Sequence, residues 1–259
     1  MNQVSESPLK VWLDRDGALL RLRLDRPKAN VLDAAMIAAV ARVLAGYGKP
    51  GAIRAALIDA EGPHFSFGAS VEEHLPEKCA EMLKGLHALL IAMLEWPRPI
   101  LVAVRGQCLG GGLEFALAGS LIFAAPDAKL GQPEMNLGVF APAASCLLPF
   151  RVNQADAEDL LLSGRSVSAD EAMRMGIVSV VAPDPEAAAL EYFDKHLAGK
   201  SAASLGFAVR AAREGMLPEA KRRIAAVERL YLDGLMTTHD ATEGLQAFLA
   251  KRAPRWKHE

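Results

Sequence analysis

The feature that most constrains this chain is an apolar strand that leads directly into a glycine cluster and then into a helix. Residues 100–104 are Ile-Leu-Val-Ala-Val, and residues 105–114 follow as Arg-Gly-Gln-Cys-Leu-Gly-Gly-Gly-Leu-Glu. The short branched apolar run predicts a buried strand, and the glycines allow a tight turn and a close approach of the backbone to a ligand. A helix that begins near Gly112 places a partial positive charge at the end of that turn.

The same alternation of strand and helix patterns extends over most of the chain. Strands are predicted at residues 11–13 and 18–24, with a turn at Asp16-Gly17, and at residues 55–59, 121–125, 129–131 and 178–181. Helices are predicted from an N-cap at Asp33 to about residue 44, over residues 76–96, and beyond residue 154. Strands that alternate with helices favour an α/β core with crossover connections.

The C-terminal part of the chain is predicted to be helical and to form a second unit. The tripeptide Gly-Lys-Ser at residues 199–201 separates it from the core, so the predicted units are residues 1–199 and residues 200–259. Residues 218–236 have the pattern of a long amphipathic helix, and residues 242–249 that of a shorter one.

Composition narrows the range of partners. The 259 residues carry a formal net charge of −2, which disfavours nucleic acid as a partner. The longest apolar run, residues 88–94, is too short to cross a membrane, and the N-terminus lacks a basic segment followed by an apolar core. The scattered Cys79, Cys108 and Cys146 have no metal-ligand spacing. We therefore expect a cytoplasmic protein with free thiols, no metal site and no membrane partner.

Two carboxylates stand out beside the glycine cluster. Glu114 falls just inside the predicted helix, and Glu134 follows a proline that restricts the chain. Two carboxylates in one cleft can hold a water molecule and exchange protons with it, which indicates acid–base chemistry on a carbonyl compound. By contrast, His64, His74 and His87 lack ligand spacing, and we expect them to be structural.

Six motifs in order identify a resemblance to the enoyl-CoA hydratase/isomerase (crotonase) superfamily. They lie at residues 25–30, 65–69, 106–114, 132–134, 163–178 and 248–251, so the resemblance runs nearly from end to end. It implies an α/β crotonase (ClpP-like) spiral of ββα units with a C-terminal helical trimerisation region. On this basis residues 1–199 would bind acyl-CoA and catalyse, and residues 200–259 would assemble a homotrimer or homohexamer.

The resemblance also implies roles for individual residues. The backbone amides of Ala69 and Gly111 would form an oxyanion hole for the thioester oxygen. Glu114 and Glu134 would be the catalytic acid and base, in an order that the sequence leaves open. The substrate, including its coenzyme A portion, would be bound by Lys28, Ala29, Asn30, Phe67, Phe140, Phe248 and Lys251. No cofactor is implied, because coenzyme A enters only as part of the substrate.

The chain departs from common hydratases at residues 138–146, where Gly-Val-Phe-Ala-Pro-Ala-Ala-Ser-Cys replaces a glycine-rich stretch. We expect this change to stiffen and fill the wall beside Glu134. With residues 64–74 and 106–112, it resembles the branch that hydrates cyclohexa-1,5-diene-1-carbonyl-CoA to 6-hydroxycyclohex-1-ene-1-carbonyl-CoA. The alternatives are a general enoyl-CoA hydratase, a hydrolase that opens the ring of 6-oxocyclohex-1-ene-1-carbonyl-CoA and, more remotely, a non-catalytic RNA-binding relative.

Overall fold

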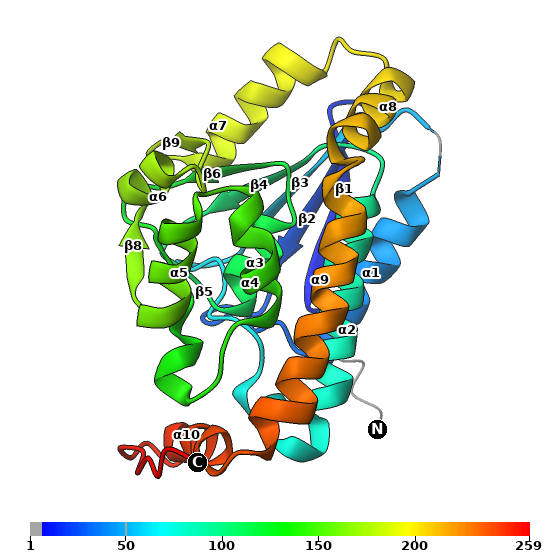
Figure 1. Ribbon diagram of the computed structural model, residues 1–259. Coiled ribbons are helices and arrows are strands. Elements are labelled where there is room, and N and C mark those ends of the chain that lie inside the picture. Colours follow the sequence, from blue (N-terminus) through cyan, green and yellow to red (C-terminus); the bar gives the residue numbers. More distant parts are fainter. Residues whose placement is uncertain (1–6, 50) are drawn as a thin grey trace, which may run out of the picture.

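Two β-sheets form the frame of the computed structural model, which describes residues 7–49 and 51–259 (Figure 1). The larger sheet has the strand order β1-β2-β3-β4-β6-β9. β1 and β2 form an antiparallel hairpin, and the remaining pairs are parallel. The bounds of these strands are Leu9–Asp14, Leu19–Leu24, Ala55–Ala60, Ile100–Val104, Leu121–Ala124 and Val180–Val181. The hairpin turn predicted at Asp16-Gly17 is confirmed, because the Gly17 N–H donates to the Asp14 carbonyl.

The smaller sheet contains β5 (Gln107–Leu109), β7 (Lys129–Gly131) and β8 (Ser166–Ser168), in that order. The chain visits the two sheets in turn, since β4 leads to β5 and helix α3 (Gly111–Leu117), and β6 leads to β7 and the 3₁₀ helix η2 (Pro133–Leu137). This alternation is the predicted succession of ββα units. Two strands of this sheet were not predicted. β5 lies within the glycine cluster, which was interpreted wholly as a turn, and β8 lies in the region beyond residue 154 that was predicted to be helical.

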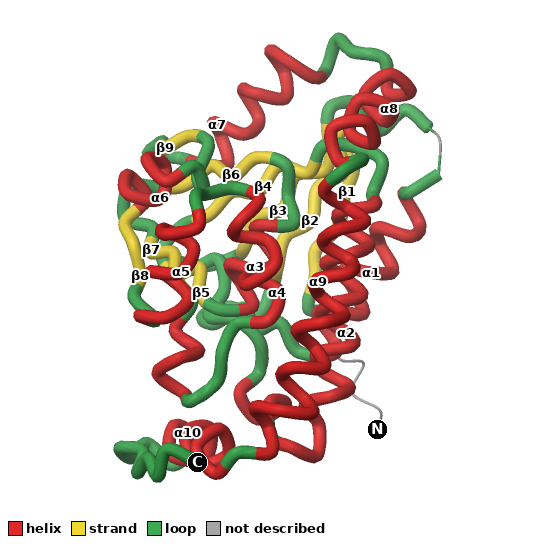
Figure 2. Tube along the Cα trace, viewed as in Figure 1, coloured by secondary structure: helices red, strands yellow, loops and turns green. Residues whose placement is uncertain are grey.

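The helices lie around the sheets, as Figure 2 shows in red. The predicted N-cap at Asp33 is confirmed, since its side chain accepts from the Met36 N–H at the start of α1. The other helices between the strands are α1 (Ala34–Tyr47), η1 (Val71–His74), α2 (Pro76–Glu95), α4 (Pro142–Leu147), η3 (Leu148–Phe150), α5 (Gln154–Ser163) and α6 (Ala169–Met175), and α7 (Pro185–Tyr192) follows the last strand. Both faces of the parallel strands are covered. Consecutive residues of β3 and β4 pack alternately into two separate clusters of buried apolar side chains.

The C-terminal helices are α8 (Ala202–Arg213), α9 (Met216–Arg229) and α10 (His239–Leu249). The long helix predicted over residues 218–236 ends as an α-helix at Arg229 and continues through a π-helical turn and a 3₁₀ turn to Thr237. α9 packs against α2 and α4, and α10 packs against η1 and η2 (Figure 1). The boundary near residue 199 stays a prediction.

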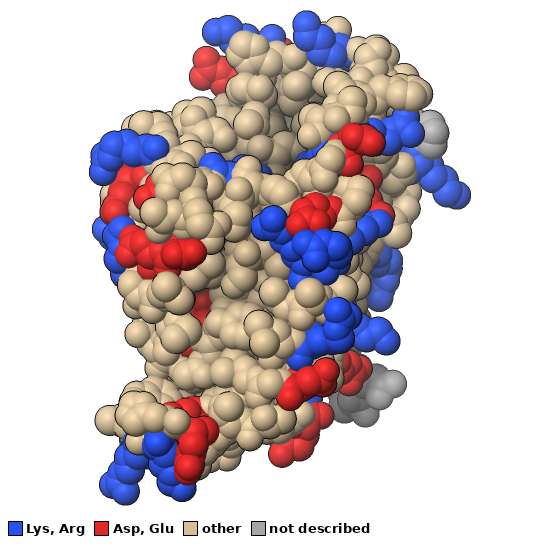
Figure 3. Space-filling view, in the orientation of Figure 1, with Lys and Arg blue, Asp and Glu red and all other residues tan. Residues whose placement is uncertain are grey.

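The surface carries charges of both signs. On the face drawn in Figure 3, Lys and Arg side chains are interspersed with Asp and Glu side chains. Within residues 7–49 and 51–259, no helix is long and apolar enough to span a membrane.

Candidate active site

Strands β5 and β7 of the smaller sheet, with the segment at Ser66 that bridges to β5, place the predicted site residues side by side. Ser66 forms a parallel bridge with Cys108, and Cys108 pairs in parallel with Leu130. Ala69 and Gly111 each follow their paired residue by three positions, and Glu134 follows Leu130 by four. Because parallel segments leave the sheet at the same edge, this register brings two backbone amides and one carboxylate to one place.

The amides of Ala69 and Gly111 are close neighbours. A Cβ atom built on Gly111 would lie 3.0 Å from the Ala69 nitrogen, and one on Gly68 would lie 3.2 Å from the Gly111 nitrogen. Among the described residues, neither amide donates a hydrogen bond to a protein acceptor. Two unpaired N–H donors at one point can together bind an oxygen that gains negative charge.

Glu114 lies in the first turn of α3, with only 3% of its surface exposed. The Ala144 N–H donates to Glu114 Oε1 at 2.8 Å, and this donor belongs to the first turn of α4. Burial raises the pKa of Glu114, while the amides of α4 and the nearby His87 oppose that rise. The orphan N–H groups of α4 thus stabilise a carboxylate at Glu114.

Glu134 lies in η2, directly after Gln132-Pro133. Its Oε2 atom is buried and has no hydrogen-bond partner among the described residues. Burial and then the negative charge of Glu114 raise the pKa of Glu134 to about 8. The raised pKa of Glu134 favours one proton on this residue near neutral pH, whereas the Ala144 amide favours the charged form of Glu114.

Both carboxylates and both amides line one cavity. The remaining wall is mostly apolar, with His74 as a further polar side chain, and consists of Phe67, Gly68, Val71, His74, Leu83, Leu86, Gly110, Pro133, Leu137, Val139 and Pro142. Phe67 lines the cavity as predicted, with 45% of its surface exposed. Phe140 instead packs edge-to-face on Tyr231 with ring centroids 5.2 Å apart, and Val139 faces the cavity in its place.

The loop that contains Lys28, Ala29 and Asn30 borders the first oxyanion segment. The Phe67 N–H donates to the Ala29 carbonyl at 2.9 Å, and Ser66 Oγ donates to the Asn30 carbonyl at 2.8 Å. The Asn30 side chain is fully buried and braces the loop, since its Nδ2 donates to two backbone carbonyls. Lys28 is exposed, so it is available to an anionic group in solution.

Phe248 and Lys251 lie at the C-terminal end of α10. Phe248 has 53% of its surface exposed, and Lys251 is exposed in the turn after the helix. Their contact with coenzyme A stays a prediction.

Two parts of the site were not predicted from the sequence. Residues 138–146 were expected to stiffen the wall beside Glu134, whereas Pro142 begins α4, whose third residue donates to Glu114. A proline at the first position of a helix was the available signal. The three histidines were also predicted alike, as structural residues. His64 accepts from the Gln107 N–H and His87 contacts Glu228 at 2.6 Å, but His74 lines the catalytic cavity.

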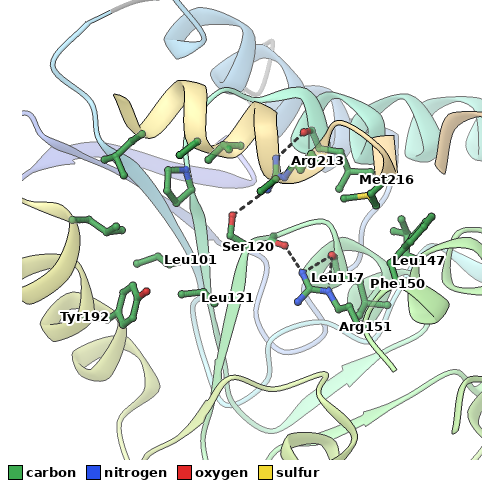
Figure 4. Close-up of a pocket in the computed structure, with 18 residues that line it drawn as sticks. Leu101, Leu117, Ser120, Leu121, Leu147, Phe150, Arg151, Tyr192, Arg213 and Met216 are labelled. Atoms are coloured by element: carbon green, nitrogen blue, oxygen red, sulfur yellow. Dashed lines mark hydrogen bonds between the residues drawn. The ribbon is translucent and has the colours of Figure 1, made fainter. Parts of the chain in front are cut away.

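A larger cavity of about 570 Å³ lies away from the carboxylates, between α8 and the start of β4 and β6 (Figure 4). Its polar side chains include Arg151 and Arg213, which donate to backbone carbonyls near the C-terminal ends of α3 and α2. Among the described residues that form its wall, none carries a carboxylate. The arginines are held by the helix ends, so this cavity lacks the acid–base groups of the smaller one.

Comparisons with known proteins agree with this geometry. The family model described as enoyl-CoA hydratase/isomerase matches residues 14–259. A cyclohexa-1,5-dienecarbonyl-CoA hydratase of Thauera aromatica is 65% identical over 254 residues, which cover 98% of this chain and 98% of that protein. A carnitinyl-CoA dehydratase of Salmonella typhi is 33% identical over 255 residues, covering 95% of this chain and 97% of that protein.

The fold has close counterparts among solved structures. An enoyl-CoA hydratase from Mycobacterium avium superimposes with a TM-score of 0.87 at 23% identity, over 97% of this chain and 100% of that one. This likeness confirms the predicted crotonase fold.

Proposed function

The chain belongs to the enoyl-CoA hydratase/isomerase family, and from this premise we propose that it hydrates cyclohexa-1,5-diene-1-carbonyl-CoA to 6-hydroxycyclohex-1-ene-1-carbonyl-CoA. The substrate is supported by the 65% identity to the Thauera aromatica hydratase over nearly the whole of both chains. The observation that carries the chemistry is the single cavity that Glu114, Glu134, Ala69 and Gly111 line together.

The reaction begins with polarisation of the thioester. The N–H groups of Ala69 and Gly111 donate to the thioester oxygen, and their bonds strengthen as that oxygen gains charge. Glu114 removes one proton from a water molecule, and the resulting hydroxide adds to the carbon β to the carbonyl. The electron pair moves through the diene to the thioester oxygen and gives a dienolate.

The dienolate collapses when it takes a proton at the far end of the former diene. Glu134 donates that proton, and the remaining double bond returns to conjugation with the carbonyl. One proton has then left water for Glu114 and one has left Glu134 for the ring, so the balance is the addition of one water molecule. Transfer of a proton from Glu114 to Glu134 through solvent restores the starting state.

The unequal surroundings of the two carboxylates support this division of roles. Glu114 accepts a hydrogen bond from Ala144, which favours its charged form and therefore its action as a base. Glu134 Oε2 is buried without a partner among the described residues, and burial raises the pKa of Glu134 to about 8, which favours its action as an acid near neutral pH.

The test is a comparison of substrates. Purified protein is incubated separately with cyclohexa-1,5-diene-1-carbonyl-CoA and crotonyl-CoA, while loss of conjugated absorbance is followed and products are identified by mass. Selective addition of one water to the cyclic diene is the expected result. A preference for crotonyl-CoA would make the protein a general hydratase. Exclusive turnover of 6-oxocyclohex-1-ene-1-carbonyl-CoA would make it a ring-opening hydrolase.

We extend the proposal to the cofactor requirement, the oligomeric state and the location of the enzyme. No cofactor takes part, and coenzyme A serves only as part of the substrate. Exposed apolar side chains on the C-terminal helices, Phe207 at 68% and Leu230 at 61%, support a homotrimer or homohexamer, which light scattering on the purified protein tests. Three free, buried cysteines support a reducing location such as the cytoplasm.

A further inference from the structure

His74 is a polar side chain in the wall of the catalytic cavity whose role the proposed reaction leaves open. It is the last residue of η1, five positions beyond Ala69, and it lines the same cavity as Glu114 and Glu134. Its Nδ1 atom lies 2.8 Å from the carbonyl oxygen of Ser70. Because a carbonyl oxygen only accepts hydrogen bonds, Nδ1 carries the hydrogen and donates it.

This contact fixes the character of the other ring nitrogen. With the hydrogen on Nδ1, a neutral imidazole presents a lone pair at Nε2. Burial lowers the pKa of His74, which favours the neutral ring, and the Ser70 carbonyl opposes this effect. Within the described part of the chain, Nε2 has no hydrogen-bond partner, and it is not fully buried.

The cavity that His74 lines offers few polar partners to an acceptor. Besides Glu114 and Glu134, its wall is mostly apolar and includes Val71 from the same 3₁₀ helix and Leu83 and Leu86 from α2. An acceptor removed from bulk water loses free energy unless a donor in the cavity replaces the water. A ligand that brings an O–H group into this cavity therefore gains from His74, and a purely hydrocarbon ligand does not.

We propose that His74 is a specificity-determining residue whose Nε2 accepts a hydrogen bond from the hydroxyl group that the reaction installs on the ring. This inference rests on the proposed function. The attacking water has two hydrogens, of which one passes to Glu114 and the other remains on the oxygen. His74 accepts from the hydrogen that remains, so both hydrogens are held and a lone pair is left to attack the ring.

Recognition of the hydroxyl distinguishes the two sides of the reaction. The cyclic diene has no hydrogen-bond donor on its ring, whereas the hydrated ring has one. A saturated cyclohexanecarbonyl ring has the same size and also lacks the donor. The affinity of these thioesters therefore separates a contact with the hydroxyl from a contact with the coenzyme A portion.

The test compares His74→Leu and His74→Gln in a Glu114→Gln background, which slows turnover of the ligand during the measurement. Dissociation constants are measured by calorimetry for 6-hydroxycyclohex-1-ene-1-carbonyl-CoA and for cyclohexanecarbonyl-CoA. Leucine is apolar, while the glutamine amide oxygen provides an acceptor near the position of Nε2. We expect His74→Leu to weaken binding of the hydroxylated ring about fivefold to tenfold, the size of one net hydrogen bond. Binding of the saturated ring should change less than about twofold, and His74→Gln should recover most of the loss.

Three outcomes would overturn the inference. Equal weakening for both thioesters would place His74 against their common portion. Unchanged affinities, with turnover retained when Glu114 is intact, would remove any contact between His74 and the hydroxyl group. Unchanged affinities, with turnover lost in both His74 variants when Glu114 is intact, would make His74 a proton carrier instead. Retained binding of cyclohexanecarbonyl-CoA reports that each variant is folded.

Turnover of the dienoyl-CoA by the wild-type enzyme distinguishes a failure of the proposed function from a failure of the role of His74. If the wild type turns over the dienoyl-CoA but the His74 variants keep the same ratio of affinities for the two thioesters, only the role of His74 is refuted. Absence of turnover refutes the proposed function and, with it, the role of His74.

Discussion

Replacement of Gly110 by alanine is the sharpest test of how the fold positions the catalytic pair. Gly110 precedes α3 and has φ +52° and ψ −128°, a conformation that side-chain-bearing residues rarely adopt. A Cβ atom at this position would lie 2.4 Å from Glu134 Oε1 and 3.4 Å from its carboxyl carbon. The variant therefore combines backbone strain with a direct collision against the catalytic acid.

The backbone strain lowers the stability of the variant, and the collision with Glu134 lowers its rate. A residue forced into such a backbone region costs about 1–3 kcal/mol of folding free energy. An ordinary contact requires the carboxylate to retreat by about 1 Å, and a misplacement of that size in a catalytic group costs about 100-fold in rate. We therefore expect Gly110→Ala to remain folded, with lower stability and about a 100-fold loss of kcat.

Denaturant unfolding and steady-state hydration of the dienoyl-CoA measure the two effects. Gly46→Ala is the matched control, because Gly46 lies in α1, where an added Cβ atom would meet no neighbouring segment of the described chain within 4 Å. That change should add about 0.5–1 kcal/mol of stability and leave turnover unaltered. A Gly110→Ala enzyme with wild-type turnover would refute the reasoning, since Glu134 would then not need the space that glycine provides.

Three further predictions concern the catalytic glutamates and the loop that contains Asn30. Glu114→Gln and Glu134→Gln should each reduce kcat by about 10²–10⁴, as measured by hydration of the dienoyl-CoA, and a loss below about tenfold in either would contradict the paired roles. The pKa of Glu134 rises from 4.5 to about 8 on folding, so its contribution to stability is complete below pH 4.5 and is lost as the pH rises through 8. Relative to Glu134→Gln, the wild type should therefore lose stability between about pH 5 and pH 9 in urea titrations, and a constant difference would argue against a buried proton. Asn30→Ala should cost about 2–3 kcal/mol in the same assay, because it leaves the carbonyls of Glu61 and His64 without their donor, and a cost below about 0.5 kcal/mol would rule out the bracing role.

The parts of the fold that sequence predicts are those whose signals are local. The strand at residues 100–104 is a continuous apolar run, and Asp33 is a side chain that caps its own helix. Each signal lies within a few residues of the element it defines, so no knowledge of distant contacts is needed. The three-residue strand β5 was missed because only its pairing with β7 distinguishes it from a turn.

The side of a loop that faces the cavity depends on geometry that the sequence does not contain. Phe140 was predicted to line the acyl pocket, yet Val139 does so and Phe140 packs on Tyr231. The two residues follow Gly138, which has φ +71° and turns the chain between η2 and α4. A shift of one residue in that turn decides whether Val139 or Phe140 points into the cavity. The hydrophobic pattern predicts burial for both residues and so does not distinguish them.

The division of labour between the two glutamates shows why a motif alone leaves a mechanism incomplete. Both positions carry the same side chain, so the sequence treats them as equivalent. They differ in what the backbone supplies, since the Ala144 N–H reaches Glu114 while Glu134 Oε2 has no donor among the described residues. A backbone donor is compatible with almost any residue type at position 144, and it therefore leaves no mark in the sequence. The asymmetry that makes one carboxyl a base and the other an acid arises from the placement of α4 against α3, which is a property of the tertiary structure.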